Sequence, residues 1–105
     1  MIHKKPFFEK VYAIVKQIPQ GKVATYQDIA ILAGSPNASR AVGSAMKNNP
    51  DKTVIPCHRI VGSDGSMHGY AFGGVSVKAE LLIKEGVVLN GDKVDLAQSR
   101  WTIEK

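Results

Sequence analysis

The first half of the chain carries three apolar stretches with helical spacing, each stopped by glycine or proline. Residues 7–17 alternate apolar side chains with Glu and Lys at the period of an amphipathic helix, and a Pro-Gln-Gly sequence ends them. Two shorter stretches follow, over 26–33 and 38–47; Thr25 precedes the first as a candidate N-cap, and Gly34 with a Ser-Pro-Asn turn separates them. The pattern predicts a scaffold helix followed by a helix-turn-helix unit.

The whole chain, residues 1–105, is expected to form one domain. It is long enough for one hydrophobic core, and 44% hydrophobic with 22% charged residues is typical of a soluble globular protein. A single cysteine excludes an internal disulfide and a Cys-rich zinc site, and it fits a reducing compartment. The sequence shows neither a signal-peptide pattern nor an apolar run of membrane length. We therefore expect a cytoplasmic protein, which in a prokaryote would associate with the nucleoid.

The charge balance favours a polyanionic partner. Lys and Arg number 14 against 9 Asp and Glu, which gives a net charge of +5 at pH 7. An excess of this kind suits nucleic acid, although many basic proteins of similar charge bind none. Composition alone therefore leaves the partner open.

The second half predicts short strands around one further helix. Residues 52–55 are expected to form a short strand or extended run, and residues 60–61 continue beyond the cysteine as a strand. Residues 67–74 form a glycine-rich loop, and Ser76 is expected to cap a helix over 77–84.

The C-terminal part predicts a hairpin that is packed back onto the domain. Residues 87–96 alternate around Asn90-Gly91, which is a strong two-residue turn signal. Trp101 follows and is expected to cover the core. Together with the helical first half, this predicts an α+β fold.

The helix over residues 38–47 has an unusual composition. Arg40 is the only long side chain in its first turns, because small residues fill the neighbouring positions: Ala38, Ser39, Ala41, Gly43, Ser44 and Ala45. A helix with so little side-chain bulk can approach another surface very closely. That surface is either a neighbouring helix of the core or a ligand as large as nucleic acid.

The only cysteine lies in the sequence Pro56-Cys57-His58-Arg59. A thiol reacts as its thiolate, so a reactive cysteine needs a base or a nearby positive charge, and His58 and Arg59 are candidates for these roles. Pro56 restricts the backbone before the cysteine. The simpler interpretation is a buried structural cysteine in an apolar run, since free cysteine is among the most buried residue types.

This motif, followed by Ile60-Val61, resembles the active-site signature of the O6-alkylguanine-DNA alkyltransferases, a family of suicide DNA-repair proteins, and the resemblance extends from about Phe7 to Gly86. It implies a small α+β domain with a helix-turn-helix, winged-helix-like DNA-binding unit, a few short strands and a C-terminal hairpin. It implies no metal and no cofactor, because the protein itself accepts the alkyl group once.

The resemblance assigns the chemistry residue by residue. Cys57 corresponds to the alkyl acceptor, His58 to the base that takes the thiol proton through a water, and Glu85 to the carboxylate that orients the histidine. For Glu85 the simpler interpretation is a solvated residue at a helix C-terminus, where an acid opposes the helix dipole. Tyr26 corresponds to the tyrosine that hydrogen-bonds or protonates guanine N3, and Asn49 to an asparagine that braces the site. The simpler interpretation of Tyr26 is a half-buried aromatic residue, and that of Asn49 is a simple turn residue.

The substrate pocket and the DNA surface follow from the same resemblance. The pocket would be lined by Pro56, Met46, Tyr70 and Phe72, with Tyr70 stacking on the extruded base. The small-residue helix would enter the minor groove, with Arg40 filling the gap left by the flipped base. The other residues expected to contact the DNA are Ala38, Ser39, Ala41, Gly43 and Tyr26. The implied partner is double-stranded DNA containing O6-alkylguanine, bound largely without regard to sequence by a monomer.

Two features depart from the longer members of this family. The N-terminal domain that usually precedes this region is not in the sequence, and the tail resembles that of the short alkyltransferase-like proteins, which bind alkylated guanine without repairing it and recruit nucleotide excision repair. Those proteins replace the acceptor cysteine, commonly by tryptophan, whereas Cys57 is present here. The loop containing Tyr70 and Phe72 is one residue longer than the common form, which affects the expected substrate range.

Three functions therefore remain. A one-shot alkyltransferase is favoured by Cys57, His58 and Glu85 occurring together, and a non-enzymatic lesion sensor by the length and tail. A sequence-specific helix-turn-helix regulator is disfavoured, because the second helix lacks the Arg, Asn and Gln side chains that read the major groove.

Overall fold

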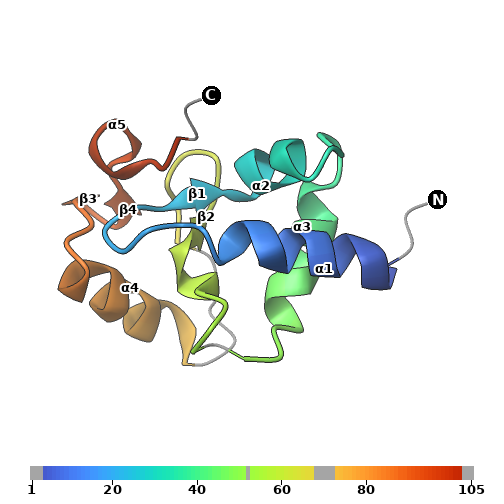
Figure 1. Cartoon of the computed structure of the whole chain (residues 1–105). Coiled ribbons are helices and arrows are strands. Elements are labelled where there is room, and N and C mark those ends of the chain that lie inside the picture. Colours follow the sequence, from blue (N-terminus) through green and yellow to red (C-terminus); the bar gives the residue numbers. More distant parts are fainter. Residues whose placement is uncertain (1–3, 52, 68–72, 103–105) are drawn as a thin grey trace.

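The computed structural model describes residues 4–51, 53–67 and 73–102 as an α+β domain, which confirms the predicted fold class (Figure 1). Its elements in chain order are α1 (Lys4–Val15), β1 (Ala24–Thr25), α2 (Tyr26–Leu32), α3 (Ser39–Lys47), the 3-10 turn η1 (Cys57–Arg59), β2 (Ile60–Val61), α4 (Gly74–Lys84), β3 (Leu89–Asn90), β4 (Lys93–Val94) and α5 (Leu96–Ser99).

Helices α1, α2 and α3 pack on one another around the main core (Figure 1). Val11 and Val15 lie one helical turn apart on α1, and both are fully buried together with Ile29 of α2 and Val42 of α3. The spacing that predicted an amphipathic first helix therefore corresponds to the face that is buried. Pro6 lies in the first turn of α1, where its missing N–H leaves no helix hydrogen bond unmade.

Helix α2 begins at a reciprocal cap. The Thr25 hydroxyl accepts a hydrogen bond from the Asp28 backbone N–H at 2.9 Å, and the Asp28 carboxylate accepts one from the Thr25 backbone N–H at 3.1 Å. Gly34 ends the helix with φ of 81°, a conformation that favours glycine. Since α3 follows after a short turn and packs on α2, the predicted helix-turn-helix is confirmed.

Two short parallel strands join the three-helix part to the rest of the domain. Ala24 of β1 pairs with Ile60 of β2, and Thr25 pairs with Val61. Strand β1 leads directly into α2, and β2 follows directly after the cysteine motif. The sheet therefore brings two segments that are more than thirty residues apart in sequence into register.

Two predicted elements in the second half were wrong. The segment before the cysteine is a turn and not a strand, because the Asp51 carbonyl accepts hydrogen bonds from the backbone N–H groups of Val54 and Ile55 at 3.2 and 2.9 Å. Helix α4 begins at Gly74 after Gly73, so Ser76 lies inside the helix and is not its N-cap. Gly73 and Gly74 both have positive φ angles, which only glycine adopts easily and which set the chain up to enter the helix earlier.

The C-terminal hairpin is present in a shorter form than predicted. Strands β3 and β4 pair antiparallel, with Asn90 opposite Lys93, so the connecting residues are Gly91 and Asp92, and Asn90 is part of a strand. The short helix α5 then follows, which the sequence pattern did not predict. Trp101 packs against the main core, as expected.

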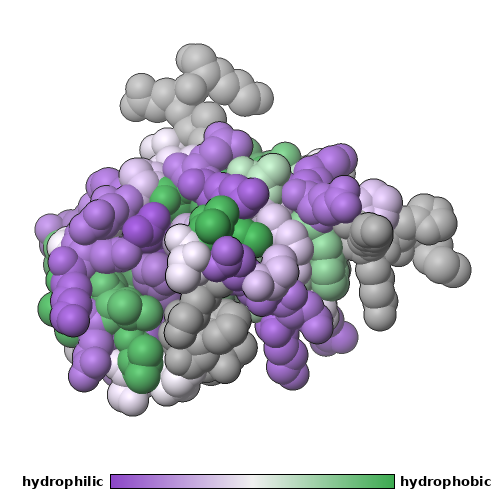
Figure 2. Space-filling model, turned by 60° about the horizontal axis from the view of Figure 1, so that its bottom comes forward, coloured by the Kyte–Doolittle hydropathy of each residue, from purple (hydrophilic) through white to green (hydrophobic). Residues whose placement is uncertain are grey.

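The surface is hydrophilic over most of the face shown in Figure 2, where apolar side chains form separate groups. The larger exposed apolar side chains among the described residues are Ile31, Leu32, Val54, Val75, Ile83 and Val88. Within residues 4–51, 53–67 and 73–102, none of the helices is both long and apolar enough to cross a bilayer.

Candidate functional site

Cys57 begins the 3-10 turn η1 and lies in the main core with 5% of its surface exposed. Its backbone N–H donates to the Ile55 carbonyl at 2.8 Å, and the Arg59 N–H donates to the Pro56 carbonyl at 2.9 Å. These bonds fold the motif into a tight turn, in place of the strand-like run of the simpler interpretation. The turn η1 leads directly into β2, so Cys57 lies three residues before the first residue of that strand.

His58, Arg59 and Glu85 form one connected group. His58 Nε2 lies 3.0 Å from Glu85 Oε2, and Arg59 binds the same carboxylate through Nε at 2.9 Å and Nη2 at 2.7 Å. Arg59 also donates from Nη1 to the Ile18 carbonyl at 2.8 Å, beyond the end of α1. Glu85 is the C-cap residue directly after α4, so this group ties η1 to the end of α4 and to the segment that follows α1.

The Glu85 carboxylate is a structured partner and not a solvated one. Only 16% of its side chain is exposed. Burial alone would raise its pKa, but the hydrogen bonds from Arg59 and His58 and their charges outweigh burial, so the pKa lies below its usual value. The carboxylate is therefore ionised at neutral pH, and the interpretation of Glu85 as a surface residue was wrong.

The ionised carboxylate fixes the tautomer of His58. An ionised carboxylate can only accept hydrogen bonds, so His58 Nε2 carries the proton and the neutral ring presents its lone pair at Nδ1. Burial lowers the pKa of His58, while Glu85 opposes this effect and Arg59 and Lys78 add to it. The imidazole is consequently neutral near pH 7 and able to accept a proton at Nδ1.

Tyr26 is the first residue of α2 and is close enough to Cys57 to respond to its charge. Burial raises the pKa of its phenol, and a negative charge on Cys57 raises it further. Gly43 of α3 faces the tyrosine ring, since a Cβ at this position would lie 3.9 Å from Tyr26 Cε1. The structure thus brings Tyr26, Cys57 and the small-residue helix together.

Asn49 braces the turn that leads to the cysteine. Its side-chain amide donates to the Ile55 carbonyl at 2.9 Å, and its side-chain oxygen accepts from the Asp51 N–H at 2.9 Å. The residue is buried, so these bonds are shielded from water. Asn49 therefore holds the segment immediately before Pro56, which is more than a solvent-exposed turn residue does.

Lys78 is the residue of this region that the sequence analysis missed. It lies on α4 with 1% of its surface exposed, and its ammonium group donates to the Ile60 carbonyl of β2 at 2.5 Å. Burial lowers its pKa to about 8, although the charge of Cys57 acts in the opposite direction and raises it in part. The signal was the spacing to the apolar Leu82, because residues four apart share one helix face and Leu82 is fully buried.

We expect the stability of the protein to depend on pH through Lys78. Its pKa is 10.5 when exposed and about 8 in the folded chain, so between these pH values only the unfolded chain holds the proton. Stability should therefore rise with pH across this range, by up to about 3 kcal/mol. Urea unfolding of the wild type and of Lys78→Met measures this effect: the free energy of unfolding of the wild type should increase relative to that of the variant as the pH rises. A difference independent of pH from 7 to 11 would contradict the lowered pKa.

The exposed face of α3 differs from the predicted one. Ala38 and Ala41 pack against the core, and Ala38 is buried, so its methyl group does not lie on the outer surface as the sequence analysis expected. Arg40, Ser44 and Lys47 are exposed at helical spacing, and the half-exposed Gly43 lies on the same stripe. Ser39 is also half-exposed. The outer face of α3 therefore carries two cations separated by small residues.

The predicted pocket residues are only partly placed by the structure. Met46 is buried in the main core, and Pro56 is half-buried before Cys57. Tyr70 and Phe72 lie outside the described residues. Across the described part of the chain, no group of three His, Cys, Asp or Glu side chains is arranged to hold a metal ion.

The fold and the site define a small α+β domain in which a helix-turn-helix accompanies a buried cysteine, a buried histidine and a half-buried glutamate. The chain belongs to the family whose model is described as 6-O-methylguanine DNA methyltransferase, DNA binding domain; that model matches residues 6–87.

Curated relatives carry the name methylated-DNA–protein-cysteine methyltransferase. The protein of Cricetulus griseus is 47% identical over 77 residues, which are 73% of this chain and 37% of the relative. That of Methanosarcina acetivorans is 45% identical over 80 residues, 76% of this chain and 51% of the relative. The chain thus spans between about a third and a half of these relatives.

Two solved structures extend the comparison. S. pombe Atl1, crystallised with damaged DNA containing O6-carboxymethylguanine, matches with a TM-score of 0.86 at 33% identity, covering 97% of this chain and 100% of Atl1. Mycobacterium tuberculosis OGT in complex with DNA matches with a TM-score of 0.72 at 40% identity, covering 75% of this chain and 48% of OGT.

Proposed function

We propose that the protein repairs O6-alkylguanine in duplex DNA by transferring the alkyl group irreversibly to Cys57. The observation that carries this proposal is the hydrogen bond between His58 and the ionised Glu85, formed by the residue next to the only cysteine. A lesion sensor has no need of a base held in a defined tautomer beside a thiol. The names of the relatives support the same activity.

The reaction needs one proton relay and one displacement. His58 Nδ1 takes the Cys57 thiol proton through a water, and the sulfur attacks the alkyl carbon as the bond from that carbon to guanine O6 breaks. The departing guanine takes a proton at N3 from the Tyr26 hydroxyl, and His58 returns a proton to the tyrosine through solvent. Exchange with solvent then moves the guanine proton from N3 to N1. Guanine is restored and Cys57 becomes a thioether. Since no described residue can cleave the thioether, each molecule acts once.

DNA binding would use the outer face of α3. On the outer face of α3 the residues between Arg40 and Lys47 are the small Gly43 and Ser44, so the helix backbone can approach the floor of a minor groove while the two cations meet phosphates or the base stack. Arg40 is exposed and makes no ion pair within the described residues. Its guanidinium plane is free to stack in the gap that the flipped base leaves. The proposed partner is duplex DNA, bound by a monomer in the cytoplasm with little sequence preference.

Arg40→Ala should slow repair of O6-methylguanine in duplex DNA by about 10- to 100-fold, because an unfilled gap leaves the flipped state unstacked by a few kcal/mol. Reaction with free O6-benzylguanine, which needs no flipping, should change by less than about twofold. Lys16→Ala is the matched control, since it removes an exposed charge directly after α1 and should affect neither substrate. Equal losses on both substrates would make Arg40 a structural residue.

A non-enzymatic lesion sensor is the second candidate function, one that would recruit nucleotide excision repair proteins. The observation favouring it is the match to Atl1 over the full length of that chain. A fluorescent O6-benzylguanine derivative distinguishes the two functions. An alkyltransferase should carry the label through denaturing electrophoresis in a 1:1 ratio. Tight binding to alkylated DNA without covalent label would favour the sensor.

A further inference from the structure

The C-terminal segment, from the last residue of α5 onward, pairs with the residues that lead to Tyr26. The Val23 N–H donates to the Ser99 carbonyl at 2.9 Å, and the Trp101 N–H donates to the Val23 carbonyl at 2.7 Å. Residues 99–101 therefore extend the parallel sheet on the side of β1 opposite β2. Lys22 adds a third connection, from its ammonium group to the Gln98 carbonyl at 3.1 Å.

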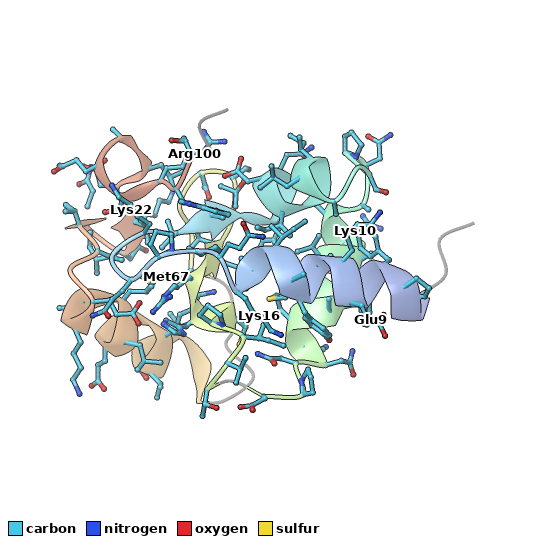
Figure 3. The ribbon with its side chains drawn as sticks, in the orientation of Figure 1. Glu9, Lys10, Lys16, Lys22, Met67 and Arg100 are labelled. Atoms are coloured by element: carbon cyan, nitrogen blue, oxygen red, sulfur yellow. The ribbon has the colours of Figure 1, made fainter. Side chains whose placement is uncertain are left out.

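Arg100 continues this connection to the cap of α2. Its Nε donates to Asp28 Oδ2 at 3.1 Å, and its Nη2 donates to Asp28 Oδ1. Asp28 Oδ2 is the same oxygen that accepts the Thr25 N–H. Figure 3 shows Arg100 between the C-terminal segment and the start of α2. Burial alone would raise the pKa of Asp28, but these hydrogen bonds lower it, so the pair is ionised at neutral pH.

We propose that Arg100 is a positioning residue that acts through Asp28 to fix the orientation of Tyr26, which packs against the core that contains Cys57. Tyr26 lies between the two members of the capping box, Thr25 and Asp28, and the backbone of this turn sets the direction of its side chain. A bidentate guanidinium on the Asp28 carboxylate limits the rotation of that carboxylate and therefore of the first turn of α2. The inference rests on the proposed function, since it needs Tyr26 to contact the alkylated base.

The segment that carries this connection lies beyond the part of the chain that the family model matches, which ends at residue 87. Strand β1 is held on one side by β2, which follows Cys57, and on the other by the C-terminal segment. Tyr26 is thus fixed relative to the cysteine from two sides. The C-terminal segment would supply a constraint on the site from residues outside the matched domain.

The test is a double-mutant cycle between Arg100→Gln and Tyr26→Phe, read as the rate of transfer from O6-benzylguanine at saturation. Arg100→Gln should lower this rate by about two- to fivefold, the range that an ion pair with a half-exposed arginine can supply. In the Tyr26→Phe background the same change should have no further effect. Arg100→Lys should restore part of the loss, because it keeps the charge but not the bidentate geometry.

Two controls separate positioning from stability. Trp101 is the only tryptophan, so its emission reports whether the C-terminal segment stays packed in Arg100→Gln. If the C-terminal segment is released in Arg100→Gln, the variant Asp28→Asn takes the place of Arg100→Gln in the cycle. The asparagine oxygen can still accept the hydrogen bond from the Thr25 N–H. Lys93 lies on the hairpin and forms an exposed ion pair of 3.1 Å with Asp64. Lys93→Gln breaks this pair and should leave the transfer rate unchanged.

Equal losses in both Tyr26 backgrounds, or no loss in either, would overturn the inference. If the wild type transfers no alkyl group, the proposed reaction fails, and the cycle is read instead as the ratio of affinities for unmodified and O6-methylguanine duplexes. The non-additivity between Arg100 and Tyr26 should then appear in that ratio. Additive effects there would contradict the positioning role independently of the reaction.

Discussion

Cys57→Ser should abolish alkyl transfer and leave binding to O6-methylguanine DNA largely intact. A serine hydroxyl has far too high a pKa for a neutral imidazole to ionise it through a water, whereas a thiol is within reach of that base. The proposed DNA-binding surface on α3 and the His58–Glu85 bond are untouched. The measurements are covalent labelling by O6-benzylguanine and the dissociation constant for a lesion duplex.

The same variant should also be slightly less stable. Cys57 is 5% exposed and lies among apolar side chains, so a hydroxyl there loses its hydrogen bonds to water, at about 1–3 kcal/mol. Thermal unfolding of both proteins measures this loss, and all assays should be run well below the lower midpoint. If Cys57→Ser still acquired the alkyl group, another residue would be the acceptor.

Glu85→Gln should slow transfer by about 10- to 100-fold without abolishing it, because the glutamine can still hold the His58 ring but supplies no charge. Glu85 raises the pKa of His58, so removing its charge lowers that pKa further. The base works in its neutral form, and the rate rises with pH through the pKa of His58. The acid limb of the pH–rate profile should therefore shift to lower pH, while the plateau falls.

Glu85→Gln should also lower the free energy of unfolding by about 2 kcal/mol, because Arg59 loses the carboxylate that it contacts twice. Glu80→Gln is the matched control, since it neutralises an exposed acid on the same helix. An unchanged pH–rate profile in Glu85→Gln, together with the loss of stability, would show that Glu85 serves only to hold Arg59.

The features that the sequence predicted well are those with local causes. Thr25 and Asp28 lie three residues apart in the sequence and cap α2 reciprocally, so Thr25 could be predicted as the N-cap from local sequence alone. The cysteine motif could be identified because its residues are contiguous and the family resemblance supplied Glu85. The helix-turn-helix depended on Gly34, whose positive φ ends α2.

The features that the sequence did not reveal depend on distant contacts. Lys78 is buried because the Ile60 carbonyl, eighteen residues away, accepts its hydrogen bond. Arg59 reaches Ile18, and Arg100 reaches Asp28, over separations of 41 and 72 residues. The turn before the cysteine replaced a predicted strand because Asn49 and Asp51 bind its backbone, which outweighs the strand propensity of Val54 and Ile55.

Intact-mass spectrometry after incubation with a duplex containing one O6-methylguanine tests the central claim most directly. The protein should gain the mass of one methyl group in place of one hydrogen and then stop, with the gain mapped to the peptide that contains Cys57. An unmodified duplex and the Cys57→Ser protein should produce no gain. A wild-type protein that binds the lesion duplex tightly, with its mass unchanged after prolonged incubation, would contradict the claim and identify a lesion sensor.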